Sequence, residues 1–297
     1  MNSGLHDNDK ADHTIRVYVS TVCQFAAWFE AANGYPLASN VLTPTDLRQY
    51  REKLITDNSK PTSTNRVIAA LRAFGEWITE SHDVANPSAK IKSVAMVRRH
   101  EPKSLSKQAQ YKLRQALDRR TAYAERQGHE VAWVKRDETI ILLLMNTGLR
   151  VGELCALKLS DIHLKGHAGF LVVRRGKGMR YREVPLNATA REAITQWLSL
   201  RAKLLAGQTE DALFITKYRK PIGTGSVQYL LRELSQEIGV EVTPHTLRHG
   251  FAKALVDSAV GLEKVATLMG HTSLETTRIY TTPTQADLAA AVNRLDL

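Results

Sequence analysis

A basic segment without helical periodicity divides this chain into two parts, and each part has its own helical pattern. Residues 86–106 hold two prolines and six Lys, Arg or His side chains but no sustained apolar repeat. This is typical of an extended connection between domains, the alternative being a surface loop inside one domain. A length of 297 residues suffices for two separate cores. We expect a flexible N-terminus at residues 1–11, a helical domain at 12–88, a basic linker at 89–104 and a second domain at 105–297.

The first part has the pattern of an all-helical domain. Apolar residues recur at helical spacing between residues 15 and 29, and Gly34 ends the run. A second helix is predicted to begin at Thr43-Pro44 and a third at Thr62, because hydroxyl side chains cap helix starts and proline fits a first turn. We expect these three helices to share one core.

The second part mixes helices with a short pair of strands. Apolar periodicity predicts helices near residues 106–118, 132–148, 188–205, 224–237, 245–258, 261–269, 273–281 and 285–296. Residues 170–174 and 179–185 are predicted to form a hairpin, and residues 213–216 a further short strand. The fold class is therefore expected to be mainly α, with a small antiparallel sheet in an α+β second domain.

The charge balance favours a polyanionic partner. The chain has 41 Lys and Arg against 30 Asp and Glu, a formal net charge of +11, and most of the excess lies in residues 101–297. Many soluble proteins are equally basic, so the charge supports a nucleic-acid partner without establishing one.

The cysteines and the hydropathy indicate the compartment. Cys23 and Cys155 both lie in apolar helical patterns, so neither a disulfide framework nor a thiolate metal site is expected. The polar N-terminus lacks the apolar region of a secretory leader, and no run of about 18 apolar residues occurs. We expect a cytoplasmic protein without a membrane partner.

A cluster of His, Arg and Tyr residues near the C-terminus has the composition of a phosphoryl-transfer site. His245 and Arg248 stand three positions apart on a predicted helix that begins at Pro244, and His271 and Tyr280 follow. Arginine offers a planar fork of donors to phosphate oxygens, histidine moves protons near neutral pH, and tyrosine can be a covalent nucleophile. Each residue taken singly could equally be structural.

A metal site is the alternative use of the same helix. His245 and His249 stand four positions apart, a spacing that can hold a metal ion. The His-Glu-x-x-His pattern is absent, however, and Arg248 would place a cation beside the metal. We expect no metal and no cofactor.

Two further segments carry candidate phosphate ligands. Arg150 follows a glycine turn at a predicted helix start, where Glu153 can orient it; a surface ion pair is the alternative. Lys177 lies between two glycines at the predicted hairpin tip, from which it could donate a proton to a leaving oxygen, or simply keep the turn soluble. The segment lacks the pattern of a nucleotide-binding P-loop.

Four motifs occur in a fixed order along the chain. They are Gly148-Leu-Arg-Val-Gly-Glu-Leu154, Arg175-Gly-Lys-Gly178, His245-Thr-Leu-Arg-His-Gly-Phe-Ala252 and Leu268-Met-Gly-His-Thr-Ser-Leu-Glu-Thr-Thr-Arg-Ile-Tyr280. In this order and at these separations they resemble the tyrosine recombinase (phage integrase) family, most closely its Xer-type and transposon-borne members. The resemblance covers roughly residues 104–283.

The resemblance implies a role for each candidate residue. Arg150 and Arg248 would clamp the scissile phosphate, Glu153 would support Arg150, and His271 would hydrogen-bond the phosphate. The remaining three residues would move protons or attack: Lys177 as general acid toward the leaving 5' oxygen, His245 as its assistant, and Tyr280 as the nucleophile that forms a 3'-phosphotyrosine.

The resemblance also implies a function and an assembly. The expected protein is a site-specific recombinase whose SAM-like and catalytic domains form a C-shaped clamp on duplex DNA with paired inverted sites. It would act as a tetramer of this chain or with a related recombinase, with residues 285–297 docked on a neighbouring protomer. The alternatives are a type IB topoisomerase-like enzyme and a catalytically silent DNA-binding protein.

Two segments depart from the Xer pattern. The first long helix that is usual in the Xer pattern is missing here, or is replaced by the polar residues 1–10. The segment of residues 119–136 is longer than the corresponding segment usually is. The motifs are compatible with chromosome dimer resolution, transposon resolution, integration or inversion.

Overall fold

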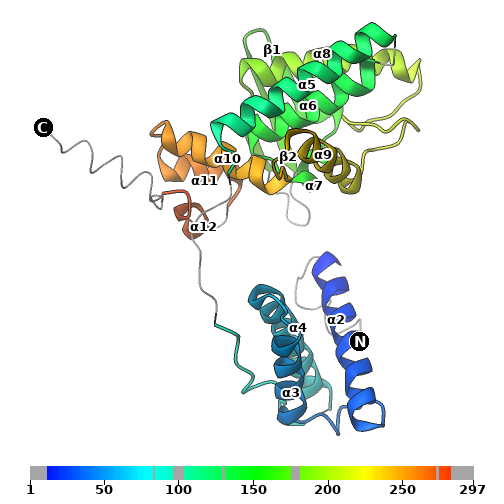
Figure 1. Cartoon of the computed structure of the whole chain (residues 1–297), viewed down its shortest axis with the longest axis vertical. Helices are drawn as coiled ribbons and strands as arrows, with labels where there is room; N and C mark the ends of the chain where they lie inside the picture. Colours follow the sequence, from blue (N-terminus) through cyan, green and yellow to red (C-terminus); the bar gives the residue numbers. More distant parts are fainter. Residues whose placement is uncertain are drawn as a thin grey trace, which may run out of the picture. The chain divides into compact units, whose positions relative to one another are not determined.

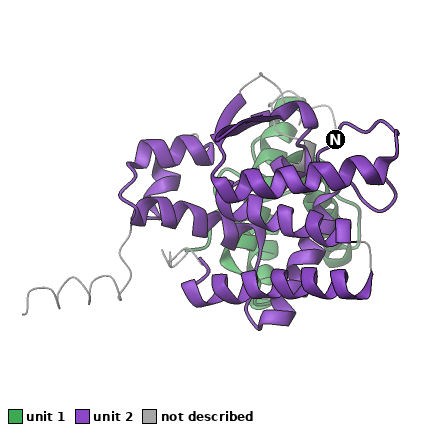
Figure 2. Ribbon diagram, turned by 90° about the horizontal axis from the view of Figure 1, so that it is seen from above, with its two compact units in different colours: residues 1–99 green, residues 100–297 purple. Residues whose placement is uncertain are grey.

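The computed structural model describes residues 12–82, 84–95, 104–128, 131–174, 181–271 and 274–281. The chain forms two compact units, residues 1–99 and 100–297 (Figure 2). The predicted N-terminal tail and the predicted helix at 285–296 lie outside the described residues.

The first unit is helical, as its periodicity predicts. Its helices are α2 (Asp12–Asn33), α3 (Pro44–Thr56) and α4 (Pro61–His82) (Figure 1). Helix α3 begins with a reciprocal cap, in which Thr43 N donates to the Asp46 carboxylate at 2.9 Å and Asp46 N donates to Thr43 Oγ1 at 3.3 Å. The three helices share a core whose largest fully buried side chains are Phe25, Phe29, Leu47, Ile68, Leu71 and Ile78.

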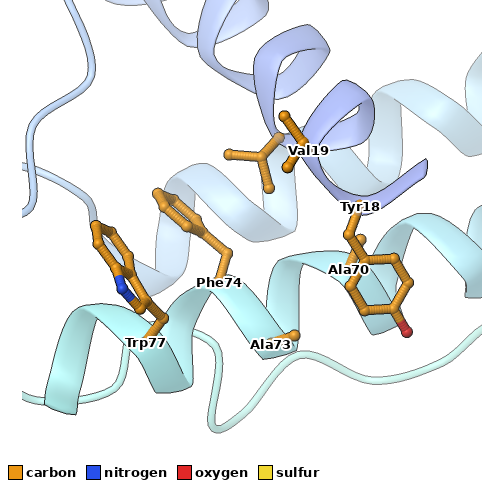
Figure 3. A pocket seen from close by; sticks show the side chains of 7 residues that line it. Tyr18, Val19, Ala70, Ala73, Phe74 and Trp77 are labelled. Atoms are coloured by element: carbon orange, nitrogen blue, oxygen red, sulfur yellow. The ribbon is translucent and has the colours of Figure 1, made fainter. Parts of the chain in front are cut away.

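A small apolar pocket lies between α2 and α4. Figure 3 shows Tyr18 and Val19 of α2 facing Ala70, Phe74 and Trp77 of α4. Among the described residues, those that line this pocket are apolar or aromatic and none is charged. The pocket lies where α2 packs against α4.

The second unit contains eight α-helices among its described residues. They are α5 (Lys107–Gln127), α6 (Val131–Thr147), α7 (Val151–Cys155), α8 (Ala188–Leu205), α9 (Thr224–Ile238), α10 (Pro244–Asp257), α11 (Leu262–Met269) and α12 (Glu275–Arg278). Most match the predicted ranges within two residues.

Helix α5 runs well past its predicted end at residue 118. The apolar repeat weakens there, but Ala124 is buried and Arg120 Nε donates to Glu237 on α9 at 2.9 Å. The helix ends at Gly128, which has a left-handed φ of 65°. Tertiary contacts with α9 thus extend a helix that local periodicity would have stopped.

The sheet has three antiparallel strands in the order β1-β2-β3. They are β1 (Ile162–Lys165), β2 (Ala168–Arg174) and β3 (Tyr181–Pro185). The predicted strand pair corresponds to β2 and β3, while β1 is an additional strand that the sequence analysis did not predict. Its register places Ile162 opposite Leu171.

The strand predicted at residues 213–216 is wrong. Lys158 and Ala212 form one isolated bridge and Ile215 and Pro221 another, so this segment joins no ladder. Leu213, Phe214 and Ile215 are all buried, which explains the apolar run that suggested a strand.

Helix α6 is the centre of the second unit. Its residues Ile140, Ile141, Leu143 and Leu144 are fully buried, and it packs against α5, α8 and α10. Helix α11 contacts both α10 and β3, and α12 contacts α11 (Figure 1). The elements that carry the described site residues are therefore linked by direct contacts, α7 and α10 to α6, α11 to α10, and α12 to α11.

Among the residues described, none of the helices combines the length and the apolar character needed to span a bilayer.

Candidate active site

The turn between α6 and α7 presents Arg150. Gly148 has a φ of 61°, and a Cβ there would collide with the Phe251 ring and lie 2.9 Å from Met269 Sδ. Arg150 is the N-cap of α7, and its backbone N and its Nη1 each donate to the Glu153 carboxylate at 2.9 Å. Its side chain remains 39% exposed, so the guanidinium is oriented but accessible to an anion.

Arg182, which the sequence did not single out, holds the other side of Glu153. Its Nη1 and Nη2 donate to the two carboxylate oxygens at 3.1 and 2.8 Å, and its Nε donates to Leu268 O at 3.0 Å. Burial alone would raise the pKa of Glu153, but the hydrogen bonds from Arg182 and Arg150 lower it to about 2. Glu153 is therefore a carboxylate shared by two guanidiniums.

No local signal distinguished Arg182 from other arginines on polar strand positions. Its neighbour Gly270 supports the arrangement, because a Cβ at Gly270 would lie 2.6 Å from Arg182 Nη1. The glycine after α11 thus leaves room for the guanidinium.

Arg248 is a buried cation fixed by main-chain oxygens. Only 6% of the residue is exposed; its Nη1 donates to Gly148 O and its Nη2 to Met269 O at 2.6 Å. Burial, followed by repulsion from Arg150, lowers its pKa to about 10, so it stays charged at neutral pH. Its two hydrogen bonds tie α10 to the turn before α7 and to the end of α11.

The start of α10 sets the direction of this helix. Thr246 N donates to Thr243 Oγ1 at 3.1 Å, Thr243 N donates to Thr246 Oγ1 at 2.8 Å, and Pro244 occupies the first turn. This cap places Arg248 one turn into the helix.

His271 lies just beyond the end of α11. Its Nδ1 is 2.9 Å from Thr277 Oγ1, and Thr277 is fully buried. Burial and then the charges of Arg248 and Arg150 lower the pKa of His271 to about 4. The imidazole is therefore neutral at physiological pH.

Tyr280 lies in the turn after α12 and not on the helix predicted for residues 273–281. Helix α12 ends at Arg278, and Tyr280 N donates to Thr277 O at 3.0 Å. The residue is 6% exposed and belongs to a small apolar cluster with Ala252 and Met269. Burial raises the pKa of the phenol, and the charge of Arg248 partly opposes this.

His249 is the direct neighbour of the Tyr280 hydroxyl. The hydroxyl lies 2.7 Å from His249 Nδ1, a hydrogen bond between residues 31 positions apart. The sequence pattern indicates no role for His249 other than that of a metal ligand. Its ring centroid is 6.5 Å from that of His245, and no group of three potential metal ligands exists among the described residues.

The structure therefore gathers five of the seven predicted site residues around common neighbours. Arg150, Glu153, Arg248, His271 and Tyr280 interact with one another directly or through charge. His245 is exposed on the first turn of α10, next to His249, and Lys177 lies outside the described residues.

Comparison with known families identifies the family of this chain. Residues 129–287 match the phage integrase family, and residues 1–82 match the phage integrase N-terminal SAM-like domain. The tyrosine recombinase XerA of Thermococcus kodakarensis is 32% identical over 290 residues, which cover 97% of this chain and 91% of the relative. The tyrosine recombinase XerC of Thermodesulfovibrio yellowstonii is 31% identical over 277 residues, which cover 91% and 86%.

Solved structures share the fold. A crystal structure of XerA recombinase has 25% identity and a TM-score of 0.52 over 99% of this chain and 95% of that one. A post-cleavage complex of XerH site-specific recombinase with a palindromic difH substrate has 21% identity and a TM-score of 0.75 over 94% and 78%. The chain belongs to the phage integrase family of tyrosine recombinases and is a site-specific recombinase that breaks and rejoins DNA.

Proposed function

We propose that Tyr280 is the nucleophile of this recombinase, and that Arg150, Arg248 and His271 bind the phosphate it attacks. The observation that carries the proposal is the position of the phenol beside two guanidiniums, one fixed by main-chain oxygens and one by Glu153. Fixed cations stabilise the charge that develops on phosphorus because they need no reorganisation during the reaction.

The proposed reaction has two balanced steps. The Tyr280 hydroxyl loses its proton to a base and its oxygen bonds to phosphorus, while the bond from phosphorus to the 5' oxygen breaks, which leaves a 3'-phosphotyrosine and a free 5' hydroxyl. Lys177, assisted by His245, gives the leaving oxygen its proton. The 5' hydroxyl of a second strand then attacks the phosphotyrosine, which restores a phosphodiester and frees Tyr280. The ester conserves the bond energy, so no nucleotide cofactor is needed.

The proposed partner is double-stranded DNA with paired inverted sites, bound by four copies of this chain or by this chain and a related recombinase. The net charge of +11 and the palindromic DNA of the XerH complex support this. In this proposal the core-binding domain is residues 12–88, the linker is 89–104 and the catalytic domain is 105–297. Residues 285–297 dock on a neighbouring protomer. The protein acts in the cytoplasm.

A covalent-trapping experiment tests the nucleophile. The Tyr280→Phe variant first selects its preferred binding site from a random-sequence duplex library. A nicked duplex of that sequence is then incubated with the wild-type chain and with Tyr280→Phe. The wild-type chain is expected to form a covalent DNA adduct and Tyr280→Phe none. An adduct with Tyr280→Phe would show that another residue attacks.

A truncation tests the assembly. Deletion of residues 285–297 is expected to preserve binding to one site and to abolish pairing of two sites and their recombination. Normal recombination by the truncated chain would refute docking of this segment.

A further inference from the structure

We propose that His249 is a further catalytic residue, which holds the Tyr280 hydroxyl through Nδ1 and takes its proton as the oxygen attacks phosphorus. The inference rests on the proposed function, since it assumes that Tyr280 is the nucleophile.

The contact has the geometry of a direct proton path. The Tyr280 oxygen is 2.7 Å from His249 Nδ1, and the ring centroids are 5.5 Å apart with the planes tilted by 53°. A phenol has one proton to donate, so Nδ1 accepts it when the other ring nitrogen carries the imidazole hydrogen. Within the described part of the chain, His249 is the hydrogen-bond partner of this hydroxyl.

The acceptor is held by the same helix as the phosphate ligand. His249 directly follows Arg248 on α10, and Arg248 is fixed by Gly148 O and Met269 O. The base and the phosphate-binding cation therefore cannot move independently. Such rigidity keeps the attacking oxygen, its base and the phosphate in register.

A base is needed because the phenol is protonated in its resting state. Burial raises the pKa of Tyr280, and a neutral phenol is a weak nucleophile. Arg150 and Arg248 are cations and cannot accept a proton, and His271 Nδ1 forms its hydrogen bond with Thr277 Oγ1 and not with the phenol. This leaves His249 as the group placed to accept the proton.

The surroundings of His249 keep it able to accept. Burial, then the charges of His245 and Arg248 on its own helix, lower its pKa, and the ring also faces Tyr280 and interacts with His271 beyond α11. The imidazole is therefore neutral at pH 7. During attack the proton moves from the Tyr280 oxygen to Nδ1, and it returns to that oxygen when the second strand displaces the phosphotyrosine.

Single-turnover adduct formation tests the proposal, with the site selected by Tyr280→Phe and a nicked duplex as substrate. His249→Gln retains a hydrogen-bonding side chain but cannot act as a base, and it is expected to be slower by about 10²-fold or more. The wild-type rate should fall at low pH as the imidazole is protonated. The His249→Gln rate should instead rise steadily with pH, because hydroxide then removes the proton.

A sulfur substitution separates this role from that of the general acid. A duplex with sulfur in place of the bridging 5' oxygen has a leaving group that needs no proton. It is expected to restore the rate of Lys177→Ala and to leave His249→Gln slow. Rescue of His249→Gln by the sulfur substrate would overturn the proposal, as would a rate within about threefold of wild type on the ordinary duplex.

Controls distinguish the two levels of inference. Gel-shift affinity and melting temperature of His249→Gln should match those of the wild type, so that the loss belongs to the chemical step. If Tyr280→Phe still forms an adduct, the proposed function fails. If Tyr280→Phe forms none while His249→Gln reacts at the wild-type rate, only the role of His249 fails.

Discussion

The Arg182 guanidinium donates a hydrogen bond from each Nη atom to the Glu153 carboxylate, at 3.1 and 2.8 Å, although the two residues are 29 positions apart in sequence. This pair joins β3 to α7, and the same carboxylate orients Arg150. The orientation of a proposed phosphate ligand therefore depends on a residue of a different element, which does not need to touch the DNA.

Loss of Arg182 is expected to reduce both stability and cleavage. Arg182→Met removes hydrogen bonds to a carboxylate side chain that is 12% exposed and to Leu268 O, which should lower the free energy of unfolding by about 2 kcal/mol. Adduct formation should slow by about tenfold or more because Glu153 loses a partner that positions it. Urea unfolding and adduct trapping measure the two effects.

Arg119→Met is the matched control for that variant. Arg119 is 64% exposed and lies 3.4 Å from Glu237, so its loss should change the free energy of unfolding by less than about 1 kcal/mol. Equal destabilisation by the two substitutions would show that the Arg182–Glu153 pair stabilises the fold no more than the exposed Arg119–Glu237 pair does.

The stabilising effect of Glu153 should disappear in acid. The pKa of Glu153 is about 2 in the folded chain, against the ordinary value of 4.5 that applies to the unfolded chain. Its contribution to the free energy of unfolding is therefore complete above pH 4.5 and is lost as the pH falls toward 2. Glu153→Gln should therefore cost on the order of 3 kcal/mol at pH 7 and progressively less below pH 4.5. Urea titrations of both proteins across this range give the difference, and a constant difference would contradict the assignment.

Gly148 should tolerate no side chain. Gly148→Ala combines a left-handed φ of 61° with a collision against Phe251, and about 2 to 4 kcal/mol of destabilisation is expected. Gly128→Ala has a similar φ of 65° but open space around its Cβ, so about 1 kcal/mol is expected. Thermal unfolding of the two variants compares them; equal losses would mean that backbone strain, and not the collision, decides.

His271 should remain neutral well below the usual titration range of histidine. Its pKa is about 4 against an ordinary 6.5, so between these values the unfolded chain binds a proton that the folded chain does not. Its contribution to stability therefore declines as the pH falls from 6.5 toward 4. Imidazole nitrogen chemical shifts, assigned with His271→Asn, should stay those of a neutral ring at pH 5. A protonated ring at that pH would show that burial and the charge of Arg248 do not lower the pKa of His271.

Part of the site follows from signals within a few residues. The Thr243-Pro244 start of α10 and the three-residue spacing of Arg150 and Glu153 predict a helix start and an ion pair, and both are present. Such features depend on backbone geometry close to each residue, which short-range patterns describe well.

The sequence by itself therefore determined the helical units, the β2–β3 hairpin, the order of the motifs and the family to which they belong. Only the tertiary structure decided that Arg182 would share Glu153, that Tyr280 would leave its helix, and that His249 would meet its hydroxyl. These contacts join β3, α10, α11 and the turn after α12. Helices α10 and α11 and the turn after α12 bury a common apolar surface around Ala252 and Met269, and β3 contacts α11. Burial of that kind is set by the packing of distant segments, which no local pattern encodes.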